Sequence, residues 1–182
     1  MQRRTLTPAE TALARSVFGD TIDYDTVGLS PTKWAFFQPR NTVMAPRGCI
    51  HFHPQGGLWR EDFGACPLHE QGLFIHEMVH IWQHQQGMFL PLRRHPFCRY
   101  DYSLKPGWRL ARYGIEQQAE IVRHMFLLPA GDVRIQHLEM FAQHDGGAGF
   151  PLRRLGLAPA ALALEQRQPL GGRAFQRYGL LV

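Results

Sequence analysis

Three residues near the middle of the chain have the types and the spacing of a metal-dependent hydrolytic site. His76, Glu77 and His80 form the pattern H-E-x-x-H. Residues four apart in a helix project from the same face, so both imidazoles can reach one metal ion. The carboxylate of Glu77 lies beside them, where it can accept a proton from a water molecule that the ion activates. The pattern therefore predicts a hydrolytic zinc site.

A catalytic zinc site needs a third protein ligand and leaves one position for water. Two carboxylates follow 36 residues beyond His80, in the stretch Y-G-I-E-Q-Q-A-E-I, at Glu116 and Glu120. Being four apart, they share one helix face, and the small Ala119 permits close helix–helix approach. One carboxylate can bind the metal while the other holds the far nitrogen of a ligating histidine. The spacing does not decide which of the two binds the metal.

Two helices are expected to position these residues. Residues 68–86 contain no proline, and Gly87 can end that helix in the left-handed conformation. Apolar residues surround most of its circumference, which predicts a buried helix; they are Leu73, Phe74, Ile75, Met78, Val79, Ile81 and Trp82. Burying two histidines and a glutamate there is unfavourable unless they are paired or coordinated. The second helix is expected over residues 113–128, ended by Pro129.

The rest of the chain predicts an α+β domain, with strands first and helices after. A capping box, Thr7-Pro8-Ala9-Glu10, opens a helix through about Phe18. Strands are expected over residues 21–27 and 49–53, with 42–45 pairing with a neighbour, and 28–32 as a turn. A third helix is expected over 132–143. We expect one domain over 1–182, with a core of about 5–144 and a C-terminal extension over 145–182.

The two helices carry a resemblance to a known group. H-E-x-x-H followed by E-x-x-[SA]-[DE] resembles the gluzincin branch of zinc metallopeptidases. More narrowly, H-E-M-V-H-I-W-Q-H-Q with Y-G-I-E-Q-Q-A-E-I-V resembles small bacterial proteins described as Vgr-related or Rhs-associated. The resemblance covers about residues 5–130.

That resemblance implies a minimal zincin-like fold and a role for each motif residue. His76, His80 and Glu116 would be the zinc ligands and Glu77 the general base. Glu120 would stand behind a ligating histidine, where the family usually has aspartate. This departure keeps open the choice between Glu116 and Glu120 as ligand. Residues 48–53 would form the strand that holds substrate backbone along the cleft.

Composition and charge limit the classes of partner and the cellular compartment that we expect. The formal net charge is +5, but the basic residues are spread along the chain, which argues against nucleic-acid binding. No apolar run approaches the roughly 20 residues that span a bilayer, so we expect no membrane partner. Three cysteines without a C-x-x-C pair indicate a reducing compartment. No apolar signal segment follows Met1, so we expect a cytoplasmic protein unless a leaderless route exports it.

Two functions follow from these residues. The first is a zinc metallopeptidase acting on peptides or proteins, with Tyr100, Tyr102 or Tyr113 as candidate donors to a transition-state oxyanion. The alternative is a non-catalytic zinc module, which would act as a structural element or as a docking element for a secretion-system partner. Such a module would need a fourth protein ligand, and His84, His124 or a cysteine could supply it.

Overall fold

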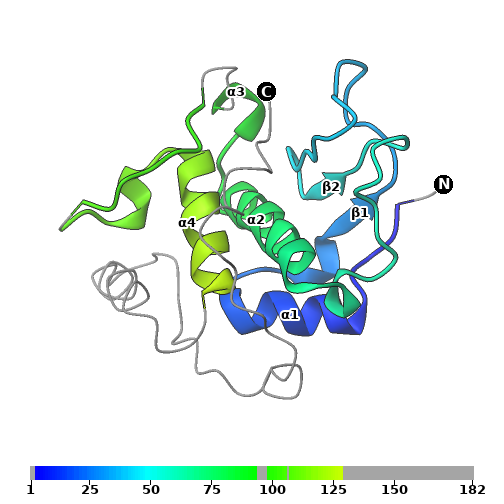
Figure 1. Cartoon of the computed structure of the whole chain (residues 1–182), viewed down its shortest axis with the longest axis horizontal. Coiled ribbons are helices and arrows are strands. Elements are labelled where there is room, and N and C mark those ends of the chain that lie inside the picture. The colour runs from blue at the N-terminus through cyan, green and yellow to red at the C-terminus, as the bar shows by residue number, and fades with distance from the viewer. Residues whose placement is uncertain (1–2, 94–97, 106, 129–182) are drawn as a thin grey trace.

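A computed structural model of the chain describes residues 3–93, 98–105 and 107–128. This part is an α+β arrangement of helices and a small two-stranded sheet. The central element is helix α2 (Leu68–Gln85), with α1 (Pro8–Phe18) below it, α4 (Ile115–Leu127) on one side and the sheet on the other (Figure 1). The α+β prediction is therefore confirmed.

Helix α1 begins at the predicted capping box, and its glutamate anchors the N-terminal region. The Thr7 hydroxyl accepts from the Glu10 main-chain N–H, and Thr7 N–H donates to the Glu10 carboxylate. Glu10 is fully buried and also accepts two bonds from Arg4, each 2.8 Å, and one from the Phe63 N–H at 2.9 Å. Phe63 opens the 3₁₀ helix η2 (Phe63–Ala65), so one carboxylate joins three separate segments.

The sheet is small and parallel. Strand β1 (Gly28–Ser30) pairs with β2 (Cys49–His51) in the register Leu29↔Ile50. Antiparallel bridges flank the pair, from Arg4 to Leu29 on one side and from Met44 to His51 on the other. The predicted pairing of residues 42–45 is thus confirmed.

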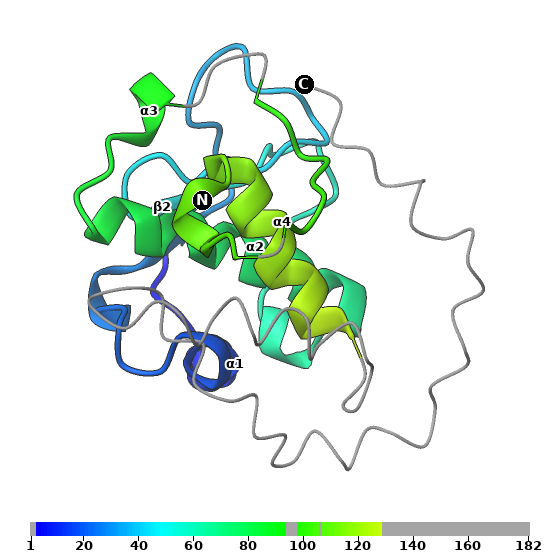
Figure 2. The ribbon, with the colours of Figure 1, turned by 90° about the vertical axis from the view of Figure 1, so that its left-hand side faces the viewer.

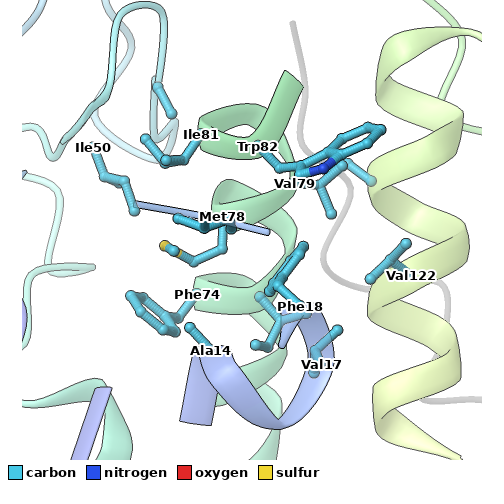
Figure 3. Close-up of a cluster of buried hydrophobic side chains, with 14 of the residues drawn as sticks. Ala14, Val17, Phe18, Ile50, Phe74, Met78, Val79, Ile81, Trp82 and Val122 are labelled. Carbon is cyan, nitrogen blue, oxygen red and sulfur yellow. The ribbon is translucent and has the colours of Figure 1, made fainter. Parts of the chain in front are cut away.

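Helix α2 is buried on opposite faces, as its apolar sequence predicts. Phe74 and Met78 point toward Ile50 and the sheet, whereas Val79 points toward Val122 on α4 (Figure 3). A helix packed on both sides has little freedom to rotate, so its histidines are held in fixed directions. Gly87 follows the helix with a φ of 83°, as predicted for a left-handed C-terminal residue.

Helices α2 and α4 lie side by side and antiparallel (Figures 1 and 2). At one end, a Cβ on Gly72 of α2 would lie 2.9 Å from a methyl carbon of Leu127. At the other end, the Gln83 amide donates to the carbonyl of Ile115. Glycine at position 72 therefore permits a close approach of the two helices.

The prediction for residues 21–32 is wrong in detail. Residues 24–26 form a 3₁₀ helix, η1 (Tyr24–Thr26), and the strand occupies Gly28–Ser30, where a turn is expected from the sequence. Asp23 explains the difference, because its side chain accepts from the Asp25 N–H and its carbonyl accepts from the Thr26 hydroxyl. These local bonds compete with strand pairing and outweigh the β-branched composition.

Two further short helices, α3 (Leu90–Arg93) and η3 (Leu110–Arg112), connect α2 to α4. The helix expected over 132–143 and the extension over 145–182 lie outside the described residues. Within the described part of the chain, no helix combines the length and the apolar character needed to cross a bilayer.

Candidate metal centre

The two long helices bring three potential metal-binding atoms together. Glu116 Oε2 lies 3.4 Å from His76 Nε2 and 3.2 Å from His80 Nε2. His76 and His80 come from successive turns of α2, and Glu116 from the first turn of α4. All three are buried, and their nearest donor atoms lie within 4.8 Å of one another, so they could hold one metal ion.

Glu120 lies on the far side of His76 from Glu116. Its Oε1 is 2.9 Å from His76 Nδ1, whereas Glu116 faces His76 Nε2. Glu120 is also 3.2 Å from Arg123 Nη1, and its Oε2 is 3.4 Å from His124 Nε2. The geometry therefore gives the two carboxylates different positions: Glu116 faces both histidines of the motif, and Glu120 stands behind one of them.

The neighbouring carboxylates raise the proton affinity of His76 more than burial lowers it. Burial by itself lowers its pKa, but the contacts with Glu116 and Glu120 and the nearby charge of Glu77 raise the pKa to about 9. Burial raises the pKa of Glu120, whereas its contact with His76 and the charge of Arg123 lower it, to about 2. Without a metal, His76 thus holds a proton at neutral pH and pairs with the ionised carboxylate of Glu120.

Glu77 is buried, with 1% of its surface exposed, and its charge acts on the neighbouring His76. Among the described residues, no protein group donates a hydrogen bond to its Oε2. A buried carboxylate oxygen without a partner is unfavourable. That oxygen is therefore an acceptor that no described protein group uses.

The three residues that could hold a metal, His76, His80 and Glu116, form what we call the metal group. Gln83 is a buried neighbour of this group and lies outside the H-E-x-x-H motif. Its Oε1 lies 2.9 Å from His80 Nδ1, and its amide nitrogen donates to Ile115 O at 3.1 Å and to Gln118 Oε1 at 3.0 Å. The signal in the sequence is an amide three residues after His80, next to apolar Ile81 and Trp82. Residues three apart share a helix face, so this contact was accessible to prediction.

The three tyrosines differ in their relation to the site. Tyr113 is buried, and its hydroxyl accepts from the Lys105 N–H, which makes it a core residue. The Tyr102 hydroxyl lies 2.8 Å from His124 Nδ1. The Tyr100 ring stacks on His76, with 6.5 Å between ring centroids and 17° between planes. Tyr100 is thus the tyrosine whose ring lies against a residue of the metal group.

Other residues are expected, from the sequence, as a fourth metal ligand or as a substrate-binding strand next to the metal group. In the described part of the chain, the group that could hold a metal includes neither His84 nor His124. Cys49 and Cys66 are free thiols. At His51 the main-chain N–H and carbonyl both pair with Met44, so β2 is covered there on its outer edge. The placement of residues 48–53 as an open substrate-binding strand therefore does not hold at His51.

Comparison with known proteins finds two matches. The chain is 44% identical over 133 residues to the type VI secretion system spike protein VgrG2b of Pseudomonas aeruginosa, and the match covers 68% of this chain but 13% of that protein. It is 38% identical to the solved effector domain of P. aeruginosa VgrG2b, with a TM-score of 0.65, covering 76% of this chain and 82% of the domain. No protein-family model matches the chain.

Proposed function

We propose a function from the premise that this chain belongs to the family of the VgrG2b effector domain. In our proposal it is a zinc-dependent metallopeptidase with a zincin-like fold. It would act as an effector domain associated with a type VI secretion spike, and its substrates would be peptides or proteins. The observation that carries the proposal is the buried group of His76, His80 and Glu116, with Glu77 beside it.

The two distances from Glu116 to the histidines fit an ion with tetrahedral coordination. Zinc binds histidine nitrogen and carboxylate oxygen at about 2.0–2.2 Å, so two ligands of a tetrahedral site lie about 3.3–3.6 Å apart. The distances from Glu116 Oε2 to the two Nε2 atoms are 3.4 and 3.2 Å, close to that separation. Two histidines and one carboxylate also match the ligand set of catalytic zinc sites, which leave the fourth position open.

The residues around the group support hydrolysis. A zinc ion held there would polarise a peptide carbonyl and lower the pKa of a water molecule. Glu77 would accept the proton of the attacking water through its unpartnered Oε2 and later pass it to the leaving amine. Glu120 would hold His76 in the orientation that directs Nε2 to the metal. Burial of Glu77 and the histidines would keep bulk water out of the reacting geometry.

The association with a secretion system is proposed from the relatives. The curated match is named a type VI secretion system spike protein, and the chain corresponds to 13% of its length. The structural match is named an effector domain. We therefore propose that the chain carries the effector activity and that a spike protein supplies the delivery.

Two variants test the peptidase proposal. Glu77→Gln should retain zinc but lose peptide hydrolysis, because the ligands remain while the base is removed. His76→Ala should lose both zinc and activity. The measurement is metal content together with a mass-spectrometric search for cleavage products in a bacterial lysate. Equal cleavage by the wild type and Glu77→Gln would refute the assigned base, and a fourth protein ligand seen by X-ray absorption would favour a structural zinc site.

A further inference from the structure

We propose that Gln83 is a positioning residue that selects the tautomer of His80 and thereby directs the Nε2 lone pair of His80 toward the metal. The proposal rests on the metal site of the proposed function. It concerns a residue outside the H-E-x-x-H pattern and outside the two carboxylates of α4. The side chain of Gln83 is fully buried.

The orientation of the Gln83 amide is determined by a main-chain carbonyl. Its Nε2 lies 3.1 Å from Ile115 O, and a carbonyl oxygen can only accept a hydrogen bond. The atom of Gln83 that faces Ile115 must therefore be the amide nitrogen. The atom that faces His80 must then be Oε1, which can only accept.

A second carbonyl gives the same orientation. Gln118 Nε2 donates to Tyr113 O at 2.8 Å, which leaves Gln118 Oε1 to accept from Gln83 Nε2 at 3.0 Å. Hydrogen bonds thus run in one direction from His80 through Gln83 and Gln118 to the Tyr113 carbonyl. Each bond in such a chain polarises the next, which strengthens the arrangement.

This chain determines where the proton of neutral His80 lies. Because Gln83 Oε1 can only accept, His80 Nδ1, which is 2.9 Å away, must carry the hydrogen. His80 Nε2 then presents a lone pair, and it points at Glu116 Oε2, 3.2 Å away. Two acceptors at this distance repel each other unless a cation lies between them. Gln83 therefore prepares His80 as a metal ligand rather than as a hydrogen-bond donor to Glu116.

Gln83 makes two kinds of contact, and they can be separated. Its amide nitrogen donates to α4, which contributes to helix packing whatever the role of the site. Its oxygen accepts from His80, which is the contact that positions the ligand. Gln83→Met removes both kinds of contact in a side chain of similar length. Gln83→Glu removes the donors but keeps an acceptor for His80.

The experiment compares zinc affinity and folding stability for these two variants. We expect Gln83→Met to bind zinc about 10–100-fold more weakly than the wild type, the usual effect of removing a partner of a metal-binding histidine. Gln83→Glu should lose at least as much stability toward urea as Gln83→Met, because its carboxylate faces the oxygen acceptors Ile115 O and Gln118 Oε1. It should nevertheless bind zinc at least about tenfold more tightly than Gln83→Met, because it keeps an acceptor for His80. Zinc affinity is measured by competition with a chelator.

A matched control is a buried glutamine away from the metal group. Gln38 accepts from the Trp34 N–H and donates to the carbonyls of Thr42 and His51, so it also makes three hydrogen bonds. Gln38→Met should lower stability without changing zinc affinity. In zinc-loaded wild type, ¹⁵N NMR of labelled histidine should show the His80 proton on Nδ1 and the metal on Nε2.

Two results would overturn the proposal: wild-type zinc affinity in Gln83→Met, or equal weakening of zinc binding in both Gln83 variants. The second result would mean that Gln83 acts only through helix packing. Failure of the peptidase proposal gives a different pattern. In that case Glu77→Gln would cleave as well as the wild type, or neither would cleave, while the ordering of zinc affinities among the Gln83 variants would still hold.

Discussion

Zinc binding to this protein should depend steeply on pH, because His76 must lose a proton before it can bind a metal. The carboxylates around His76 overcome the effect of burial and hold its pKa at about 9 in the metal-free protein. Two pH units below that value, protonated His76 exceeds the deprotonated form about 100-fold. The apparent dissociation constant for zinc should therefore fall about 50-fold from about pH 7 to about pH 9, and about twofold more before it levels off at higher pH.

The substitution Glu120→Gln tests whether the carboxylates are what raises the pKa of His76. Glu120 is one of the groups that raise the pKa of His76, so removing its charge should lower that pKa. The levelling of zinc affinity should then begin at a lower pH than in the wild type. Absolute zinc affinity should also decrease, because the neutral amide oxygen accepts from His76 Nδ1 more weakly than a carboxylate does. The shapes of the two pH profiles are therefore compared, not their absolute levels.

The assay is chelator competition at a series of pH values, corrected for the protonation of the chelator. Calorimetry in two buffers with different ionisation enthalpies gives the number of protons released. We expect about one proton per zinc near neutral pH from His76 and fewer above its pKa of about 9. A flat affinity profile with no proton release would show that His76 is neutral in the metal-free protein and would refute this reasoning.

Two further predictions concern the fold around the site. Glu10→Ala should lower the free energy of unfolding by about 3–5 kcal/mol in urea titrations, because it removes the carboxylate partner of Arg4 and leaves the buried Phe63 N–H without its acceptor; a loss below about 1 kcal/mol would contradict this. Gly64→Ala should cost about 1–3 kcal/mol by the same measurement, since its Cβ would lie 2.6 Å from the Ala9 Cβ and 2.7 Å from the Ala9 carbonyl carbon; unchanged stability would show that α1 can shift without loss.

The sequence predicted the long helices better than the region before them. Helix α2 differs from its predicted range by one residue at its end, because an uninterrupted apolar pattern and Gly87 determine its extent. Residues 21–32 were assigned wrongly because the hydrogen bonds of Asp23 are local and compete with strand formation. Composition reports average preferences, and one well-placed aspartate can override them.

The choice between Glu116 and Glu120 shows a different limit of sequence reasoning. Both residues lie on the same face of α4, so their spacing cannot decide which one faces the histidines. The choice depends on how far α4 is shifted along α2, which is set by distant contacts such as Gly72 with Leu127. The role of Gln83 likewise depends on its contact with Ile115, which lies 32 residues away in the chain.

The placement of the metal group on two helices has a consequence for the stability of the chain as a whole. His80 and Glu116 are 36 residues apart, and an ion bound by both would close the intervening segment into a loop, as a disulfide would. By the entropy of cross-linking a chain, closing a loop of this length stabilises the folded state by about 4 kcal/mol. Unlike a disulfide, this link would not depend on oxidation. Chelation would then lower the stability of the fold, as reduction does in a disulfide-bonded protein, by removing one link between α2 and α4 while their side-chain contacts remain.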